Sequence, residues 1–306
     1  MRFSFFVLFF TLIGASHLLG QGSFIVIDGT TGHILASNQP ERRARVASLT
    51  KVATAVVALD WLRVSNRSAS EMVVIPPEAF EGGVNPVGLQ PGDQLQLRDA
   101  LASALVQSDN VAATAVAIHV GRDLLARGGP GRNPYDAFVF QMNQLAGKVG
   151  MRRTRFTNPH GLDLPGQNPQ SNAADMARLA RYAIGTQGFV FYVSQKERRI
   201  EIRRAGGSQS YVLRNTNQLL GELGVNGMKT GRTRQAGDCL ILSAERPPEV
   251  RQAGAESQVT PRRIILVLLG STNREAEGRQ ILSRAWGAYD AWAAAGRPSR
   301  ENQRLE

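Results

Sequence analysis

Three short clusters of polar residues, far apart in the chain, carry the groups needed to form a covalent acyl-enzyme. They are Ser48-Leu-Thr-Lys51, Ser108-Asp-Asn110 and Lys229-Thr-Gly231. Residues three apart at the start of a helix lie one turn apart on the same face, so Ser48 and Lys51 are within hydrogen-bond reach. A serine hydroxyl becomes a good nucleophile only when a neighbouring base takes its proton. The first cluster therefore predicts a serine nucleophile with a lysine as its base.

The scarcity of lysine supports this interpretation. Only four of the 36 basic residues are lysines, and two of these four, Lys51 and Lys229, fall inside the clusters. Arginine does not deprotonate in proteins, whereas a lysine amine becomes a base when burial, a like charge or a helix N-terminus lowers its pKa. We therefore expect Lys51 to be largely neutral at working pH. Taken alone, Ser48 and Lys51 could be an ordinary serine at a helix start beside a solvated lysine. The presence of the other two clusters disfavours this interpretation.

The second and third clusters offer groups that suit a peptide substrate. Ser108 could shuttle a proton to a leaving amine, and the Asn110 amide could hold a substrate amide, although Ser108 or Asn110 could equally cap a following helix. Lys229 offers a positive charge and Thr230 a hydroxyl to a substrate carboxylate. Gly231 allows close backbone approach by a ligand. The alternative for this third cluster is a plain edge strand that its lysine protects from aggregation.

The flanking sequence predicts the elements that must bring these clusters together. A β-hairpin is expected over 23–37, and an apolar, buried helix is expected from Ala47 to Leu62. Further helices are expected at 97–106, 110–120, 135–149, 172–185 and 274–294, and strands at 189–194, 199–203, 227–232, 239–244 and 262–270. Residues 245–261 are polar and are expected to form a long hairpin connection. Strands near both ends with helices between predict an α+β fold: one antiparallel sheet flanked by helices, with an adjoining helical lobe.

Composition and charge limit the classes of function. The 306 residues carry a net charge of +11, so the surface should attract anionic partners. The single Cys239 excludes an internal disulfide, and it reads as a small core residue. The four histidines are scattered without metal-ligand spacing, so neither a metal site nor a cofactor is predicted.

The N-terminus predicts export. Residues 1–22 have the positive start, apolar run and small-residue end of a signal peptide, with no sharp cleavage site. We expect residues 23–296 to form the catalytic domain and 297–306 a polar, frayed tail. Export to the periplasm or the outer face of the cytoplasmic membrane excludes nucleic acid as a partner. The positive charge is then expected to favour an anionic wall polymer or a membrane surface.

The three clusters, in this order, resemble those of the D-alanyl-D-alanine carboxypeptidases, which are low-molecular-mass penicillin-binding proteins. The resemblance covers most of residues 23–294 and extends to four further segments, which are Phe156–Asp163, Asn172–Leu179, Arg214–Asn217 and Thr233–Leu240. It implies a β-lactamase/transpeptidase-like fold, peptidoglycan stem peptides as substrates and β-lactams as covalent inhibitors.

The same resemblance implies roles for individual residues. Ser48 would be the acylated nucleophile and Lys51 its general base, while Ser108 and Asn110 would shape the cleft. The backbone N–H groups of Ser48 and Arg232 would form the oxyanion hole. Binding of the terminal carboxylate would fall to Lys229, Thr230 and Arg214. Arg232 departs from the aromatic residue or histidine often found at its position.

Two other functions remain open. A β-lactamase on the same fold would need a carboxylate to activate water, and class A enzymes use a glutamate, but the chain has no glutamate between Glu81 and Glu197. The other alternative is a non-catalytic envelope protein that binds glycan or lipid. The positive charge favours this binder weakly, whereas the intact Ser48 and Lys51 argue against it.

Overall fold

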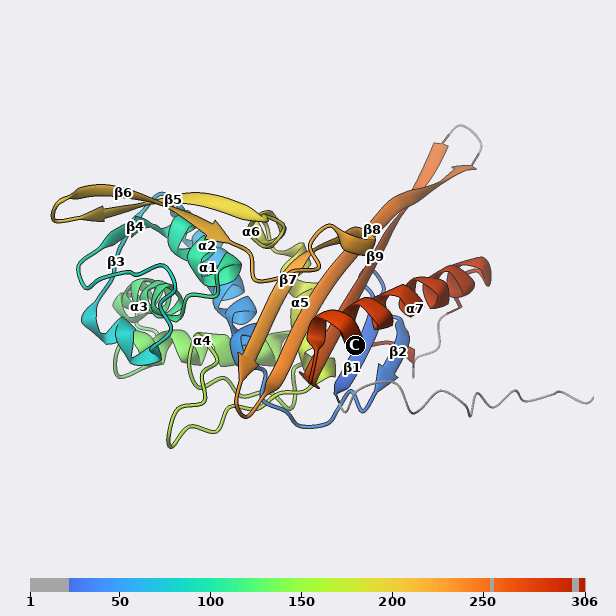
Figure 1. Ribbon diagram of the computed structural model, residues 1–306, viewed down its shortest axis with the longest axis horizontal. Helices are drawn as coiled ribbons and strands as arrows, with labels where there is room; N and C mark the ends of the chain where they lie inside the picture. The colour runs from blue at the N-terminus through green and yellow to red at the C-terminus, as the bar shows by residue number, and fades with distance from the viewer. Residues whose placement is uncertain (1–21, 254–255, 299–302, 306) are drawn as a thin grey trace, which may run out of the picture.

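A five-stranded antiparallel sheet forms the centre of the protein. The computed structural model describes residues 22–253, 256–298 and 303–305, so nearly all of the predicted signal segment lies outside the described residues. The sheet has the order β2-β1-β9-β8-β7 (Figure 1). Its strands are β1 (Ser23–Asp28), β2 (Ile34–Asn38), β7 (Val225–Thr233), β8 (Gly237–Ala253) and β9 (Glu256–Ser271). The N-terminal strand β1 therefore pairs with β9, as the predicted closure by both ends of the chain requires.

The sheet is covered on both faces, which explains why all six residues of β1 are buried. Alternate residues of a strand point to opposite faces. Phe24 and Val26 pack in one core with Trp286 and Tyr289 of the closing helix α7 (Arg274–Ala294). Ile25 and Ile27 belong to the other core, which the helical lobe supplies. Figure 1 shows α7 lying along one face of this sheet.

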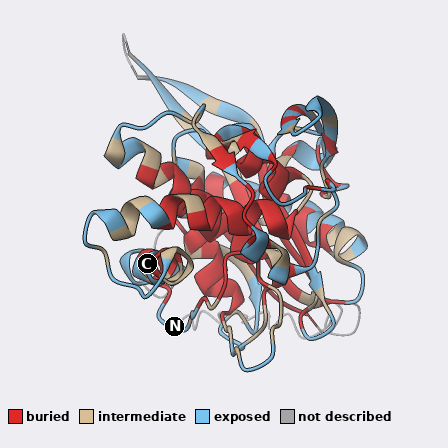
Figure 2. Ribbon diagram, turned by 90° about the vertical axis from the view of Figure 1, so that its left-hand side faces the viewer, coloured by how far each residue is buried: buried red, intermediate tan, exposed pale blue. Residues whose placement is uncertain are grey.

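The helical lobe is built around α1 (Lys51–Ser65), whose first nine residues are all buried. This burial confirms the predicted apolar helix, and Figure 2 shows the buried helices filling the middle of the molecule. The other helices are α2 (Leu97–Val106), α3 (Asn110–Ala126), α4 (Pro134–Lys148), α5 (Ala173–Gly185) and α6 (Phe189–Val193), and the short 3₁₀ helices are η1 (Ala47–Thr50), η2 (Pro77–Gly82) and η3 (Glu222–Gly224). Among the described residues, no helix combines the length and apolarity needed to cross a membrane.

A second sheet, which the sequence did not predict, lies beside the helical lobe. Its order is β3-β4-β5-β6, and its strands are β3 (Met72–Val74), β4 (Gln94–Gln96), β5 (Glu197–Arg204) and β6 (Gly207–Arg214). The predicted strand at 199–203 belongs to this sheet and not to the central one. Two of its strands have only three residues, too few to display an alternating pattern.

Three local predictions were wrong. Phe189–Val193 form helix α6 where a strand was expected over 189–194, and Phe189, Tyr192 and Val193 are buried at helical spacing. Residues 245–253 and 256–261 continue β8 and β9 as a two-stranded ribbon, which projects from the molecule in Figure 1 and pairs Val250 with Val259. Within the tail that was expected to fray, Leu305 is instead buried, and its N–H donates to the Gly32 carbonyl oxygen.

Candidate active site

Ser48 and Lys51 meet where the chain enters the buried helix. Ser48 lies in η1, and Lys51 is the first residue of α1. The Lys51 Nζ to Ser48 Oγ distance is 2.9 Å, as the three-residue spacing predicts. Ser48 is partly exposed, whereas Lys51 has no exposed surface. The hydroxyl is therefore open to a ligand while the amine beside it is shielded from water.

Lys51 is fixed by two further contacts. Its Nζ donates to Asn110 Oδ1 at 2.6 Å and to the His160 carbonyl oxygen at 3.0 Å. Burial lowers the Lys51 pKa to about 7, and the neighbouring Asp109 carboxylate opposes this shift. A pKa near 7 is consistent with the expected neutral amine, which can accept the Ser48 proton near neutral pH.

The second cluster supports Lys51 from the start of α3. Asp109, and not Ser108 or Asn110, caps this helix, because its side chain accepts the Ala112 N–H. Burial raises the Asp109 pKa to about 6. The Asn110 side chain links Lys51 to the Gly82 carbonyl, because its oxygen accepts from Lys51 and its Nδ2 donates to that carbonyl. Its predicted contact with a substrate amide stays a prediction. Ser108 is partly exposed on the turn before the helix, with a φ of 65°.

The third cluster runs along β7, an edge strand of the central sheet, immediately beside η1. A Cβ atom added to Gly231 would lie 3.0 Å from the Ser48 backbone nitrogen. A side chain here would require η1 to shift by a few tenths of an ångström, so glycine suits the close approach of the strand to the nucleophile. Because β7 pairs with β8 on one side only, its other edge can accept an extended peptide.

Lys229 and Thr230 are both buried on this strand. The Lys229 ammonium donates to the Thr230 carbonyl oxygen at 3.1 Å, and the Thr230 hydroxyl lies 2.6 Å from the Thr216 hydroxyl. Burial lowers the Lys229 pKa well below its ordinary value, with the charges of Lys51 and Arg274 adding to the effect. Desolvation therefore disfavours the charged form of the Lys229 amine.

Arg274 was not identified from the sequence. It is the first residue of α7, and its Nη1 donates to the Gly231 carbonyl oxygen and to Asp238 Oδ1, each at 3.3 Å. This contact places a guanidinium directly behind the third cluster. Nothing in the local sequence signals it, because 43 residues separate Arg274 from Gly231.

The two other predicted arginines are exposed. The Arg214 side chain is 78% exposed on β6 and pairs with Glu197 at 3.4 Å. None of its contacts in the described structure reaches residues 229–231, so the structure gives no support for a carboxylate-binding role. The Arg232 side chain is also 78% exposed and pairs with Asp238. Its backbone follows Gly231 beside Ser48, where the predicted oxyanion role requires it.

The loop after α4 packs against α1 on the buried side of the site. The Thr54 hydroxyl donates to the Pro159 carbonyl oxygen, and His160 Nδ1 accepts the Leu162 N–H. Burial lowers the His160 pKa to about 3, so its ring is neutral. Asp163, the only acidic residue between 156 and 169, accepts the Thr233 hydroxyl at 2.6 Å. The loop therefore ties α1 to the end of β7.

Several known proteins resemble this chain. Residues 16–252 match the family model Peptidase S11, described as D-alanyl-D-alanine carboxypeptidase. The carboxypeptidase DacD of Salmonella typhimurium is 33% identical over 88% of this chain and 63% of its own length. A D-alanyl-D-alanine endopeptidase of Pseudomonas aeruginosa is 31% identical over 73% of this chain and 67% of its own length. The chain thus spans less than two thirds of the first curated relative.

Solved structures share the fold. The Streptomyces K15 DD-transpeptidase aligns with a TM-score of 0.72 and 22% identity, over 90% of this chain and 100% of its own. DacD of Francisella tularensis aligns with a TM-score of 0.67 and 26% identity, over 85% of this chain and 69% of its own. The protein therefore has the predicted β-lactamase/transpeptidase-like α+β fold. On the family match and these identities, the chain belongs to the peptidase S11 family of D-alanyl-D-alanine carboxypeptidases.

Proposed function

We propose that the protein is a penicillin-sensitive serine D-alanyl-D-alanine carboxypeptidase that acts on peptidoglycan stem peptides after export. The observation that carries the proposal is the 2.9 Å contact between the partly exposed Ser48 hydroxyl and the buried Lys51 amine. Family membership supports the substrate class, and the geometry supports the choice of nucleophile and base.

In the proposed reaction the substrate lies along the free edge of β7. The neutral Lys51 amine accepts the Ser48 proton as the oxygen attacks the carbonyl between the two terminal D-alanines. The negative oxygen that develops is stabilised by the backbone N–H groups of Ser48 and Arg232. The peptide C–N bond then breaks, and the proton held by Lys51 passes by way of Ser108 to the leaving amine. Water then hydrolyses the Ser48 ester and frees the serine.

The substrate carboxylate would meet the third cluster. Thr230 offers a hydroxyl, and Lys229 and Arg274 supply positive potential from behind the strand. Because burial lowers the pKa of Lys229, the permanently charged Arg274 guanidinium is the steadier source of this potential.

The function is tested with the peptide diacetyl-Lys-D-Ala-D-Ala and its D-Ala-L-Ala isomer. We expect release of D-alanine from the first peptide and no release from the second, and the Ser48→Ala variant supplies the background. The proposal fails if the parent protein releases no D-alanine, or if Ser48→Ala releases as much as the parent. Labelling by a fluorescent penicillin distinguishes the proposed enzyme from a non-catalytic binder, because the binder would stay unlabelled.

Labelling by a fluorescent penicillin also distinguishes the proposed carboxypeptidase from a β-lactamase. A β-lactamase must hydrolyse its penicilloyl ester rapidly, with a carboxylate that activates water. Asp163, in the loop after α4, instead accepts a hydrogen bond from the Thr233 hydroxyl, and its Oδ1 lies 3.7 Å from Arg45 Nη1. We therefore expect a long-lived penicilloyl adduct on Ser48.

A further inference from the structure

The segment Arg214–Asn217 carries a hydroxyl group that reaches the third cluster. Thr216 Oγ1 lies 2.6 Å from Thr230 Oγ1. This distance is within the usual range for an O–H···O bond, so one of the two hydroxyls donates its hydrogen to the other. Thr230 is only 4% exposed, whereas Thr216 is partly exposed. The two side chains therefore form a pair, called here the hydroxyl pair, with one member buried and the other open to solvent.

The backbone around Thr216 is fixed by contacts with both parts of the molecule. The Thr216 N–H donates at 3.1 Å to the carbonyl oxygen of Val106, the last residue of α2. Ser108 of the second cluster follows two residues after Val106. On the other side, Asn217 Nδ2 donates at 3.3 Å to the carbonyl oxygen of Gly227 on β7. The hydroxyl pair therefore lies between the helical lobe and the edge strand of the central sheet.

The hydroxyl pair has one hydrogen left to offer to a ligand. Each hydroxyl has one O–H donor, so the bond inside the pair uses one hydrogen and leaves the other. Within the described part of the chain, neither Thr216 Oγ1 nor Thr230 Oγ1 makes another hydrogen bond. A carboxylate only accepts hydrogen bonds, so the remaining hydrogen suits it.

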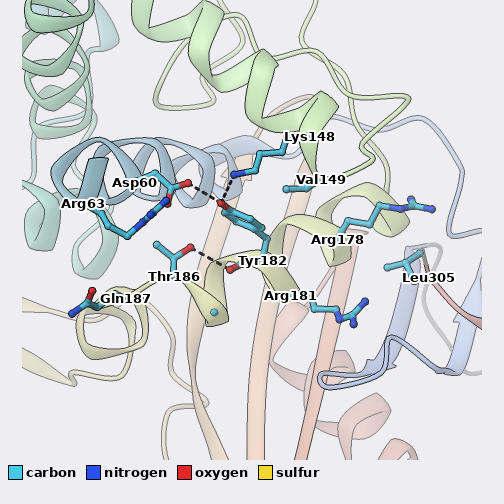
Figure 3. A pocket seen from close by; sticks show the side chains of 11 residues that line it. Asp60, Arg63, Lys148, Val149, Arg178, Arg181, Tyr182, Thr186, Gln187 and Leu305 are labelled. Atoms are coloured by element: carbon cyan, nitrogen blue, oxygen red, sulfur yellow. Dashed lines mark hydrogen bonds and ion pairs between the residues drawn. The ribbon is translucent and has the colours of Figure 1, made fainter. Parts of the chain in front are cut away.

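The Tyr182 hydroxyl, beside the later turns of α1, has no hydrogen left to offer. It accepts from Lys148 Nζ and donates to Asp60 Oδ2, each at 2.9 Å, in a cavity of about 570 Å³ (Figure 3). Its single hydrogen is therefore already bound by a carboxylate of the chain. Asp60 lies nine residues after Lys51 on α1, which corresponds to roughly 14 Å of helix. Tyr182 thus provides a control for the loss of a hydroxyl away from the candidate active site.

We propose that Thr216 is a positioning residue that directs the Thr230 hydroxyl toward the terminal carboxylate of the substrate. When Thr216 donates to Thr230 Oγ1, the Thr230 hydrogen is free to donate to the carboxylate. A hydrogen bond received by a hydroxyl also strengthens the bond that this hydroxyl donates. Without Thr216, no described residue fixes the direction of the Thr230 O–H bond. The inference rests on the proposed carboxypeptidase function and concerns how that site recognises the free end of a peptide.

The test compares two thioester substrates that differ in the charge of the leaving group. Both carry the acyl group diacetyl-Lys-D-Ala. One ends in thioglycolate, which bears a carboxylate, and the other ends in an S-isobutyl group, which has a similar shape and no charge. Thiol release, corrected for release by Ser48→Ala, gives kcat/KM for each, and the ratio of the two values measures the preference for a carboxylate. We expect Thr216→Val to lower this ratio about tenfold, because it weakens a hydrogen bond to a charged group.

Further variants separate positioning from other roles of Thr216. Thr216→Ala should repeat the result of Thr216→Val, whereas Thr216→Ser keeps the hydroxyl and should stay within about threefold of the parent ratio. Thr230→Val should lower the ratio as much as Thr216→Val, and the double variant should lower it no further, because both changes break the same chain of hydrogen bonds. The control Tyr182→Phe should keep the parent ratio. Thermal unfolding of every variant shows which proteins are folded.

Three outcomes would overturn the proposal alone. An equal loss on both thioesters in Thr216→Val would show that Thr216 supports the fold and not the contact with the carboxylate. Losses that multiply in the double variant would show that the two hydroxyls bind independently. A parent protein that releases thiol equally from both thioesters would show that the site does not select a carboxylate. By contrast, a parent that releases no thiol from either substrate would refute the proposed peptidase function, and this inference with it.

Discussion

Replacing Lys51 by methionine is expected to lower the rate of Ser48 acylation by penicillin about 10³- to 10⁴-fold. Methionine has a similar length and no charge, so it removes the base from a fully buried position without adding volume. Arginine would also remove the base, but it would bring a larger and permanently charged group into that site. The measurement is the second-order rate of labelling by a fluorescent penicillin.

The control for this prediction is the Ser48→Ala variant, alone and combined with Lys51→Met. Residues that act as one unit in a reaction do not contribute additively. We therefore expect the double variant to be no less active than Ser48→Ala, and thermal unfolding to show that all three proteins fold. Acylation of Lys51→Met within about tenfold of the parent rate would contradict the assignment of Lys51 as the base.

Replacing Gly161 by alanine is expected to cost about 4 kcal/mol of unfolding free energy and to impair acylation. Gly161 has a φ of 85°, which disfavours any side chain, and an added Cβ would lie 1.8 Å from the Ala47 carbonyl oxygen and 2.7 Å from Thr50 Oγ1. Both neighbours belong to η1, the 3₁₀ turn that holds Ser48. Relief of the clash must therefore move either the loop or the nucleophile.

Gly166→Ala is the matched control, because it lies in the same loop with a φ of 73° and no atom within 4 Å of an added Cβ. It carries the backbone strain alone, so we expect it to cost about 1 kcal/mol and to leave acylation intact. Urea unfolding followed by tryptophan fluorescence measures both variants. Equal midpoints for the two would show that contact with η1 does not hold the loop in place.

Much of the candidate site could be predicted because its chemistry is local. The spacing of Ser48 and Lys51 on one helix start fixes their contact wherever the helix lies. The apolar residues after Ala47 predicted a buried helix, and burial is the main cause of the lowered Lys51 pKa. Strands near both ends of the chain also predicted that one antiparallel sheet would be closed by the two ends, as the pairing of β1 with β9 shows.

The rest depends on contacts between distant segments. Arg274 meets Gly231 only because α7 begins beside β7, and the His160 carbonyl reaches Lys51 across 109 residues. The contact of Asn110 Oδ1 with Lys51 also joins segments 59 residues apart, and no local pattern signals it. The β8–β9 ribbon was missed because polar residues on both of its faces, such as those around Glu249, hide the alternation that marks a half-buried strand.

The pH dependence of Ser48 acylation by penicillin tests the central claim most directly. With a Lys51 pKa of about 7, the amine is mainly protonated below this pH and cannot accept the Ser48 proton. We predict that the rate rises about tenfold per pH unit below pH 6, passes its midpoint near pH 7 and levels off above pH 8. A rate that keeps rising to pH 10, as an ordinary lysine would give, would contradict the account.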